Sequence, residues 1–381
     1  MRVLRPISLW VIFGFVISIC ASAQVTGLDR LSVVGDQPET ALSLASDLSP
    51  SLKPDEVKRA MRKVADWQLS RLRRQYTNDW TMAALYTGLM AAYEATGEAR
   101  YRAAVKDAGW KLEWKLGPRF NHADDVAVGQ SYLDLYVVDK APMMIVDVRE
   151  QLLRSMRVET DPDHPVWWWC DALFMAPPVW VRMYKVSGDI ALLNHMDREW
   201  WLTSSRLYDP REHLYSRDAS FLDKKEANGK KLFWSRGNGW VMGGLVRVLQ
   251  YLPNSYPARA KYVAQFTEMA SKVASLQGED GLWRPGLLDS AAYPLPEVSG
   301  SAFFTYALAW GINQKILDRK TYAPVVEKAW RGMIGRIYQD GRLGCIQPIG
   351  AAPDSYKPTA SYTYGVGAFL LAGSEVAKLG K

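Results

Sequence analysis

The sequence predicts an all-α fold, and three features support this prediction. From residue 51 onward, hydrophobic residues recur near the 3.6-residue helical period, and short breaks separate the segments. Strand-like alternation is confined to residues 145–148 and the region of residues 232–233. Amphipathic, charged segments alternate with segments that are apolar on all faces, which must be buried on every side. About six such pairs fit the length and predict an inner ring of helices inside an outer ring, an (α/α)6 barrel.

The individual helices follow from hydrophobic spacing and end signals. In residues 53–74, hydrophobic side chains lie on one face and basic side chains on the other. Asn78 is predicted to cap the next helix, which Gly97 ends. Helices are predicted over residues 53–74, 80–96, 99–116, 127–138, 143–156, 167–186, 189–204, 239–252, 258–276, 301–313, 323–340 and 364–378. The inner ring is predicted from residues 81–93, 167–184, 239–249, 301–311 and 364–373.

The N-terminus has the order of a secretory signal. Arg2 and Arg5 precede an apolar stretch over residues 7–19, and Ala21-Ser22-Ala23 follows it. This stretch is shorter than the ~20 residues of a membrane-spanning helix. A lipid anchor on Cys20 is the less favoured alternative, because Ile19 stands where a small residue is needed. We therefore expect residues 1–23 to be removed and the protein to be exported, periplasmic or secreted, without a membrane span.

The rest of the chain is predicted to form one catalytic domain. Residues 24–50, rich in Ser, Asp and Leu, are typical of a linker or a loosely docked arm, and residues 51–381 form the barrel. We expect a monomer. Cys170 and Cys345 remain after cleavage, and free buried thiols are favoured over a disulfide between them.

Charge and aromatic content narrow the class of ligand. Removing Arg2 and Arg5 from a formal net charge of +7 leaves +5, which suits an acidic substrate. Basic residues are interleaved with acids, as in Lys106-Asp107, so nucleic-acid binding is not expected. The 16 Trp and 19 Tyr exceed what packing requires, and such a surplus is typical of sugar-binding clefts.

In a double-ring barrel, the loops that precede the inner helices gather at one end. Residues distant in sequence can therefore line one cleft. The polar loops of this kind are residues 78–80, 122–125, 167–171, 234–240, 297–301 and 361–362.

Asp171 is the leading candidate for acid catalysis. It follows Trp167-Trp168-Trp169-Cys170 and opens an apolar segment. Aromatic surroundings desolvate a carboxyl and raise its pKa, so that it can act as an acid near neutrality. The alternative is a first-turn acid that satisfies free backbone N–H groups of the helix.

Two further segments carry candidate polar residues. Of the adjacent acids Asp124 and Asp125, one is expected to cap a helix and the other to face the cleft, and we assign the cleft to Asp125. Gln130, five residues on, is either a substrate contact or a structural hydrogen-bonding group.

The segment Trp234-Ser235-Arg236-Gly237-Asn238-Gly239-Trp240 combines a guanidinium with two indoles. The Arg236 fork suits a carboxylate, the rings offer stacking faces, and the glycines permit close backbone approach. A structural turn braced by Arg236 is the alternative. Arg217, beside Asp218, is a second basic candidate, for which a surface ion pair is the simpler interpretation.

Other chemistries lack their motifs. The four histidines show no zinc-ligand spacing, and no nucleophile elbow, phosphate-binding loop or dinucleotide fingerprint is present. We therefore expect neither a metal nor a cofactor.

Taken as a set, four motifs resemble glycoside hydrolase family 105, the unsaturated rhamnogalacturonyl hydrolases and their relatives. The similarity runs in order over about residues 55–378. The motifs are Ala123-Asp124-Asp125 with Gly129-Gln130, Trp168-Trp169-Cys170-Asp171-Ala172-Leu173-Phe174-Met175-Ala176-Pro177, Trp234 to Trp240, and Ser299-Gly300-Ser301-Ala302-Phe303-Phe304-Thr305-Tyr306-Ala307.

The resemblance implies an (α/α)6 barrel that hydrates the C4=C5 enol ether of an unsaturated uronic acid at the non-reducing end of lyase products. Asp171 would protonate C4, and Asp125 would position substrate or water. Trp169 and Trp234 would stack on sugar, and Arg236 would contact the uronate. A histidine found in some members before the Trp-x-Arg motif has no counterpart here, and Arg217-Asp218 occupies its region.

The resemblance implies a rhamnogalacturonan-type aglycone. Alternatives are an unsaturated β-glucuronyl hydrolase on another acidic glycan, an inverting glycosidase or epimerase on the same barrel, and a non-catalytic glycan-binding barrel.

Overall fold

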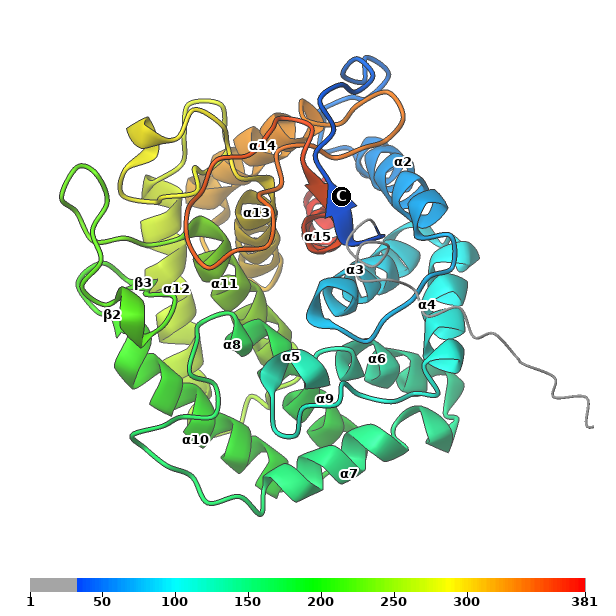
Figure 1. The fold of residues 1–381 in the computed structure, drawn as a ribbon, viewed down its shortest axis with the longest axis vertical. Helices are drawn as coiled ribbons and strands as arrows, with labels where there is room; N and C mark the ends of the chain where they lie inside the picture. Colours follow the sequence, from blue (N-terminus) through cyan, green and yellow to red (C-terminus); the bar gives the residue numbers. More distant parts are fainter. Residues whose placement is uncertain (1–32, 381) are drawn as a thin grey trace, which may run out of the picture.

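The computed structural model describes residues 33–380, whose helices form two concentric layers (Figure 1). The inner layer contains α3 (Trp80–Thr96), α6 (Gly129–Asp139), α8 (Ala172–Met175), α9 (Pro177–Ser187), α11 (Ser235–Leu249), α13 (Val298–Asn313) and α15 (Thr363–Leu379). The outer layer contains α2 (Pro54–Leu72), α4 (Ala99–Lys111), α7 (Val146–Ser155), α10 (Ile190–Leu207), α12 (Arg259–Ser275) and α14 (Arg319–Ile334). The predicted all-α double ring is confirmed.

The inner helices close into a ring. Helix α3 packs on α6 and α15, α15 on α13, α13 on α11, and α11 on α8, while α6 packs on α9. Almost every residue of α13 and α15 is buried, as expected for helices surrounded on all sides. The hydrophobic core therefore occupies the ring and the space between the two layers.

Glycines allow two of these inner helices to touch through their backbones. A Cβ atom on Gly88 of α3 would lie 2.5 Å from the Cα atom of Gly367 in α15, and one on Gly367 would lie 2.2 Å from the carbonyl oxygen of Ala84. Any larger side chain would push the helices apart. The small residues in the apolar segments thus set the diameter of the ring.

Most helix ends lie within about four residues of the predicted ones, but α4 ends at Lys111 and not at residue 116, and α14 spans Arg319–Ile334 and not residues 323–340. Two further corrections concern α3 and the helix predicted over residues 167–186. Asp79 caps α3 by accepting a hydrogen bond from the Thr81 amide, where Asn78 was predicted. The helix predicted over residues 167–186 is broken into α8 and α9. Residues 167–171 have irregular backbone, and Pro177 opens a new helix because a proline nitrogen has no proton to donate to the preceding turn.

The strands are short. β2 (Tyr208–Asp209) pairs with β3 (Leu214–Tyr215) in a loop hairpin, and β1 (Gly35–Asp36) pairs with β4 (Ser361–Tyr362). Residues 145–148, despite their weak strand-like alternation, enter α7 after a 3-10 turn over Pro142–Met144, in agreement with the helix predicted over residues 143–156.

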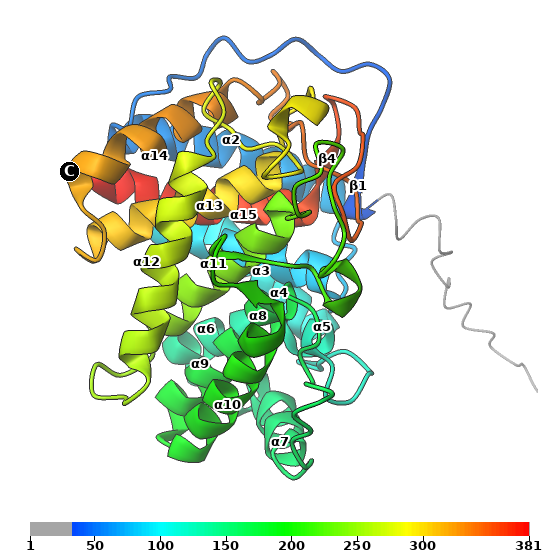
Figure 2. The same ribbon diagram turned by 90° about the vertical axis from the view of Figure 1, so that its left-hand side faces the viewer.

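The described part of the predicted arm, residues 33–50, lies along the barrel. Besides the β1–β4 pair, Asp36 forms ion pairs with Arg71 and Arg342, and Ala45 donates a backbone hydrogen bond to Ile337. Figure 2 shows β1, β4 and the short helix α5 (Ala123–Val126) at the same end of the barrel. The predicted signal segment, residues 1–23, lies outside the described residues.

Within residues 33–380, none of the helices combines the length and hydrophobicity that crossing a bilayer requires.

Candidate active site

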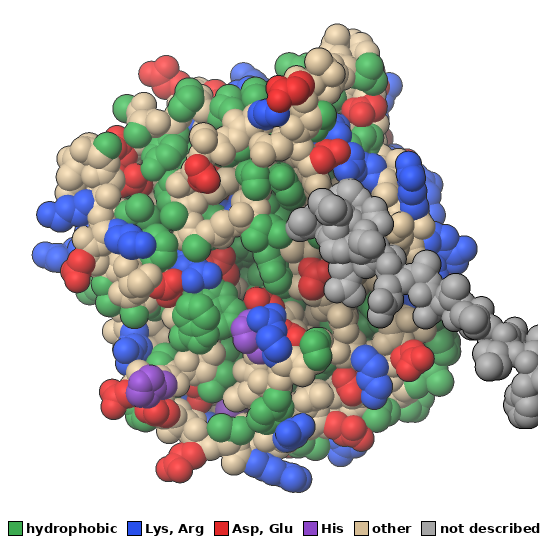
Figure 3. Space-filling view, viewed as in Figure 1, with side chains coloured by type: hydrophobic (Ala, Val, Ile, Leu, Met, Phe, Trp, Pro, Cys, Tyr) green, Lys and Arg blue, Asp and Glu red, His purple; other side chains and the backbone are tan. Residues whose placement is uncertain are grey.

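The loops that precede the inner helices meet at one end of the barrel, as predicted. Trp169 forms an antiparallel bridge with Asp218, and the Cys170 amide donates to the Arg217 carbonyl over 2.8 Å. Trp234 bridges Gly286 in the same manner. In the space-filling view, acidic and basic side chains gather around a hollow near the middle of this face, with hydrophobic surface beside them (Figure 3).

Asp171 stands immediately before α8, but its side chain makes no capping hydrogen bond. The Cys170 thiol points to one carboxyl oxygen over 3.5 Å, and Arg217 Nε lies 3.9 Å from the same oxygen. The Asp171 side chain is 14% exposed. Burial raises its pKa, although the positive charges of Arg217 and Arg236 oppose the rise. The geometry favours a desolvated acid over a helix cap.

The two adjacent acids of α5 have different partners. Asp125 is buried and accepts hydrogen bonds from the backbone amide of Arg119 (2.9 Å) and from Arg119 Nε (2.7 Å). Asp124 has no comparably close partner, since Arg119 Nη2 lies 3.7 Å away. Burial, followed by the charge of Asp171, raises the pKa of Asp124 to about 7. The carboxyl that interacts electrostatically with Asp171 is therefore Asp124, whereas the cleft role had been assigned to Asp125.

Arg217 lies inside the site and is more than a surface ion pair. Its Nη1 donates to Asp218, and its Nε is buried without a hydrogen-bond partner among the described residues. The side chain remains 21% exposed and stands beside Asp171. Its guanidinium is positively charged, partly exposed and beside a buried carboxyl, so Arg217 is well placed to bind an anion.

Arg236 is used differently from the prediction. Its two terminal nitrogens donate to the carbonyl oxygens of Gln347 and Pro348, each over 2.7 Å, and the residue is 1% exposed. The fork expected to bind a substrate carboxylate is thus occupied by backbone. Arg236 braces the loop after Gln347 and contributes positive charge near Asp171.

The glycines of this motif serve packing. Residues 235–239 form the first turn of α11 with ordinary helical backbone. A Cβ on Gly237 would lie 3.1 Å from Cys170 Sγ, and one on Gly239 would lie 3.1 Å from the Cα of Gly300. The expected approach of backbone to ligand is not what these glycines provide.

The predicted stacking rings are largely buried. Trp169 is 4% exposed and packs between His122 and Trp168, with ring centroids 5.0 and 4.6 Å away. Trp234 donates its Nε1 proton to Gln347, and Trp240 lies among Phe174 and Phe303. Little of any of these three faces is available to a sugar.

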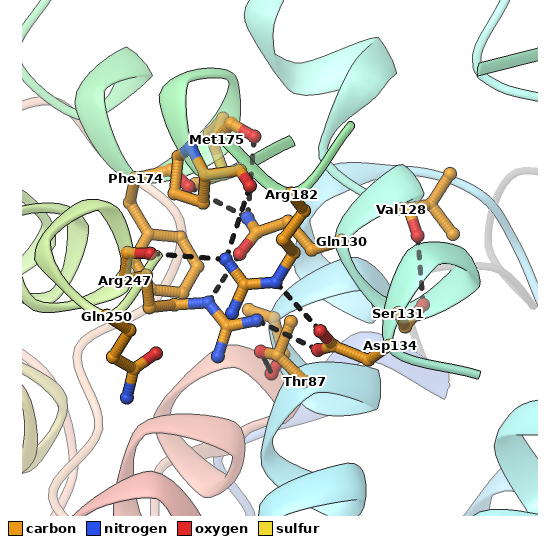
Figure 4. A network of polar contacts seen from close by, with 12 residues as sticks. Thr87, Val128, Gln130, Ser131, Asp134, Phe174, Met175, Arg182, Arg247 and Gln250 are labelled. Atoms are coloured by element: carbon orange, nitrogen blue, oxygen red, sulfur yellow. Dashed lines mark hydrogen bonds and ion pairs between the residues drawn. The ribbon is translucent and has the colours of Figure 1, made fainter. Parts of the chain in front are cut away.

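Gln130 is a structural residue. Its amide nitrogen donates to the Phe174 carbonyl, and its oxygen accepts from Arg247 Nε (Figure 4). Arg247 in turn shares Asp134 with Arg182. The structural alternative for Gln130 fits, and the predicted contact with substrate does not.

Three residues that organise the site, Arg119, His122 and Glu297, were not among the candidate site residues named from the sequence. Arg119 binds Asp125, and His122 accepts a hydrogen bond from the Asp124 amide through Nδ1 and packs on Trp169. Glu297, fully buried, caps α13 through the Ser299 and Gly300 amides and also accepts from the Gln347 amide. The Gly117 amide also donates to the Asp125 carbonyl, so long-range loop contacts fix this region. Spacing along the sequence carries no signal for such contacts.

Cys170 and Cys345 are buried and free. Over residues 33–380, no three His, Cys, Asp or Glu side chains converge as metal ligands would.

Comparison with known proteins places this site in context. The model of Glycosyl Hydrolase Family 88 matches residues 54–380. The chain is 40% identical over 359 residues to an unsaturated 3S-rhamnoglycuronyl hydrolase of Formosa agariphila, covering 89% of this chain and 95% of that protein. It is 30% identical to a protein of the same name from Alteromonas sp., covering 94% and 98%. A solved structure described as a glycosyl hydrolase family 88 protein from Bacteroides vulgatus superposes with a TM-score of 0.82 at 32% identity, covering 86% of this chain and 99% of that one.

Proposed function

Since the chain belongs to Glycosyl Hydrolase Family 88, we propose that it removes a 4,5-unsaturated uronic acid from the non-reducing end of lyase-generated oligosaccharides in which this acid is linked to rhamnose. The names of the two relatives support the rhamnosyl aglycone. The four sequence motifs support placing the chain in the family 105 branch of such enzymes. It is a hydrolase that acts on an oligosaccharide.

The observation that carries the proposal is the pairing of two poorly compensated carboxyls, Asp171 and Asp124, at the end of the barrel. Burial raises the pKa of both, and Asp124 reaches about 7. The negative charge of Asp171 contributes to the rise at Asp124, so the two carboxyls are electrostatically coupled. A retained proton beside a cationic anion-binding group suits protonation of an acidic substrate.

Proton transfer from this pair starts the reaction. The Asp171 carboxyl gives its proton to C4, whose new C–H bond takes the electron pair of the C4=C5 bond. Positive charge develops at C5 and is shared by the ring oxygen. Water adds to C5 and returns a proton to the carboxylate, and the hemiketal opens with loss of the aglycone. One group thus acts first as acid and then as base.

Arg217 would bind the uronate and prepare the acid. The exposed part of its guanidinium is available to the substrate carboxylate. Binding an anion there offsets the positive charge that lowers the pKa of Asp171. Substrate binding would therefore favour the protonated form of Asp171, next to C4.

Absorbance of the enol ether in the ultraviolet tests this function. The protein is incubated with unsaturated disaccharides that carry rhamnose, galactosamine or glucosamine next to the uronic acid. The absorbance should fall for the rhamnosyl disaccharide and fall less for the others. Preference for a hexosamine would indicate a different unsaturated glucuronyl hydrolase. A rise in absorbance on intact polymer, or no change with any substrate, would refute hydration.

A further inference from the structure

A groove beside the candidate active site is lined by Trp168 and has no role in the proposed chemistry. Its accessible volume is about 390 Å³, within the ~300–1,000 Å³ typical of ligand sites. The lining is mostly apolar. It is formed by residues 163–168, by Thr203, Arg206 and Leu207 of α10, and by Asp218 and Ala219.

Trp168 is distinct among the tryptophans of this region. It is 50% exposed, whereas Trp167, Trp169, Trp234 and Trp240 are at most 4% exposed. One side of its ring packs against Trp169 at 4.6 Å, and the Arg217 guanidinium lies 5.4 Å from its centroid. An indole held in place with half its surface in water is typical of a binding face.

The groove is built in advance of any ligand. Thr203 Oγ1 donates to the Trp167 carbonyl, and Arg206 Nη1 donates to the Asp163 carbonyl, which ties the loop to α10. The Asp218 carboxylate is neutralised by Arg217 and also accepts from Ser220. That wall therefore presents apolar surface without an unpaired negative charge, and an acidic chain can pass it.

The groove adjoins the candidate active site. Trp168 and Asp218 line it, and both contact Arg217, whose Nε is 3.9 Å from the Asp171 carboxyl. Since only the terminal uronic acid reacts, the remainder of a longer oligosaccharide must leave this point along the surface. Resting on the proposed function, we propose that the groove is a subsite for sugars beyond the first aglycone residue, with the apolar face of a pyranose stacked on Trp168.

The test compares unsaturated disaccharide with unsaturated tetrasaccharide prepared from a polysaccharide of alternating rhamnose and uronic acid. The wild-type protein should have the higher kcat/KM for the tetrasaccharide. Trp168→Ala should reduce the tetrasaccharide-to-disaccharide ratio of kcat/KM about 3- to 10-fold, mainly through KM, and Trp168→Phe should restore much of it.

Two variants separate the subsite from indirect effects. Ala219→Glu adds a carboxylate to the exposed rim and should lower tetrasaccharide kcat/KM while leaving disaccharide turnover unchanged. Trp110→Ala removes an equally exposed indole, 51%, from outer helix α4 and should leave the ratio unchanged.

The outcomes are distinguishable. Equal use of both lengths, or an unchanged ratio in Trp168→Ala and Ala219→Glu, overturns the subsite while the hydrolase function stands. Absence of turnover on either length overturns the proposed function itself.

Discussion

Two aspartates of the inner ring expose the same fraction of their side chains, 14% each, yet their pKa values move in opposite directions. Asp171 lies at the end where the inner helices begin, and burial raises its pKa. Asp134 lies in the middle of α6. Burial alone would raise its pKa as well, but Arg182 and Arg247 outweigh this effect and lower it.

The difference comes from hydrogen bonds to the carboxylate. Asp134 accepts from Arg182 Nε over 2.8 Å and from Arg247 Nη2 over 3.1 Å (Figure 4). Asp171 also has two arginines nearby, but Arg217 Nε is 3.9 Å away and Arg236 is bonded to backbone carbonyls. Nearby positive charge alone does not keep a buried carboxyl ionised, because hydrogen-bond donors must also reach its oxygen atoms. We infer that Asp134 serves stability and that Asp171 serves chemistry.

Replacing Asp171 gives the largest expected effect. Asp171→Asn removes the transferable proton at nearly constant shape, so kcat should fall about 10²–10⁴-fold. Enol-ether absorbance measures this loss, and calorimetric titration with the disaccharide should show retained binding. The free energy of unfolding should stay the same or rise, because an under-compensated buried acid is removed. Turnover within a few fold of wild type would exclude Asp171 as the donor.

Replacing Asp134 tests the other member of the comparison. Asp134→Asn removes the carboxylate that two buried guanidiniums share and should lower the free energy of unfolding by about 3–5 kcal/mol. The folded-state pKa of Asp134 is below its ordinary 3.8, so the stabilisation is present above about pH 4 and is lost as pH falls. Denaturant melts should show a deficit that shrinks in acid. An unchanged melt at pH 7 would show that the network contributes nothing to stability.

The barrel could be predicted from the sequence, and Asp171 could be proposed as the acid, because their signals are local. Three tryptophans adjoin Asp171, and all-round apolar helices have one stable arrangement, inside a ring. The choice between Asp124 and Asp125 depended on Arg119, whose backbone and side chain reach Asp125 only after the loop has folded. The sequence alone does not distinguish two adjacent acids, because their difference depends on hydrogen-bond donors that the fold brings to one of them.

Gln130 and Trp240, which were predicted to contact the substrate, are buried for a geometric reason. Trp240 lies five residues after Ser235, the first residue of α11, which is about 7.5 Å further along the helix, and Gln130 lies in α6, the helix after the one that contains Asp125. At that depth the ring is filled by its own side chains, and Trp240 is 1% exposed. The sequence places Trp168 near Asp171. Only the irregular backbone before α8 shows that, of the three consecutive tryptophans at 167–169, Trp168 alone is exposed.

Replacing Arg217 has an intermediate expected effect and tests whether its guanidinium binds the uronate carboxylate. Arg217→Gln removes the charge proposed to bind the uronate and should raise KM about 10- to 100-fold, the value of a charge-assisted hydrogen bond. The disaccharide assay measures this effect, and Lys224→Gln serves as a control because Lys224 contacts Phe221 outside the site. Equal changes in the two variants would indicate general electrostatic attraction instead of a specific contact.

The smallest effect, and the most specific, concerns the electrostatic coupling between Asp124 and Asp171. The negative charge of one carboxyl favours the protonated form of the other, and the pKa of Asp124 is raised to about 7. In Asp124→Asn, Asp171 keeps its two arginines and loses this neighbour, so the alkaline limb of the kcat/KM profile should move to lower pH by about 1 unit. Arg217→Gln removes a positive charge that lowers the pKa of Asp171 and should move the same limb to higher pH. Shifts in the same direction would contradict electrostatic control of Asp171, because two neighbours of opposite charge must move its pKa in opposite directions.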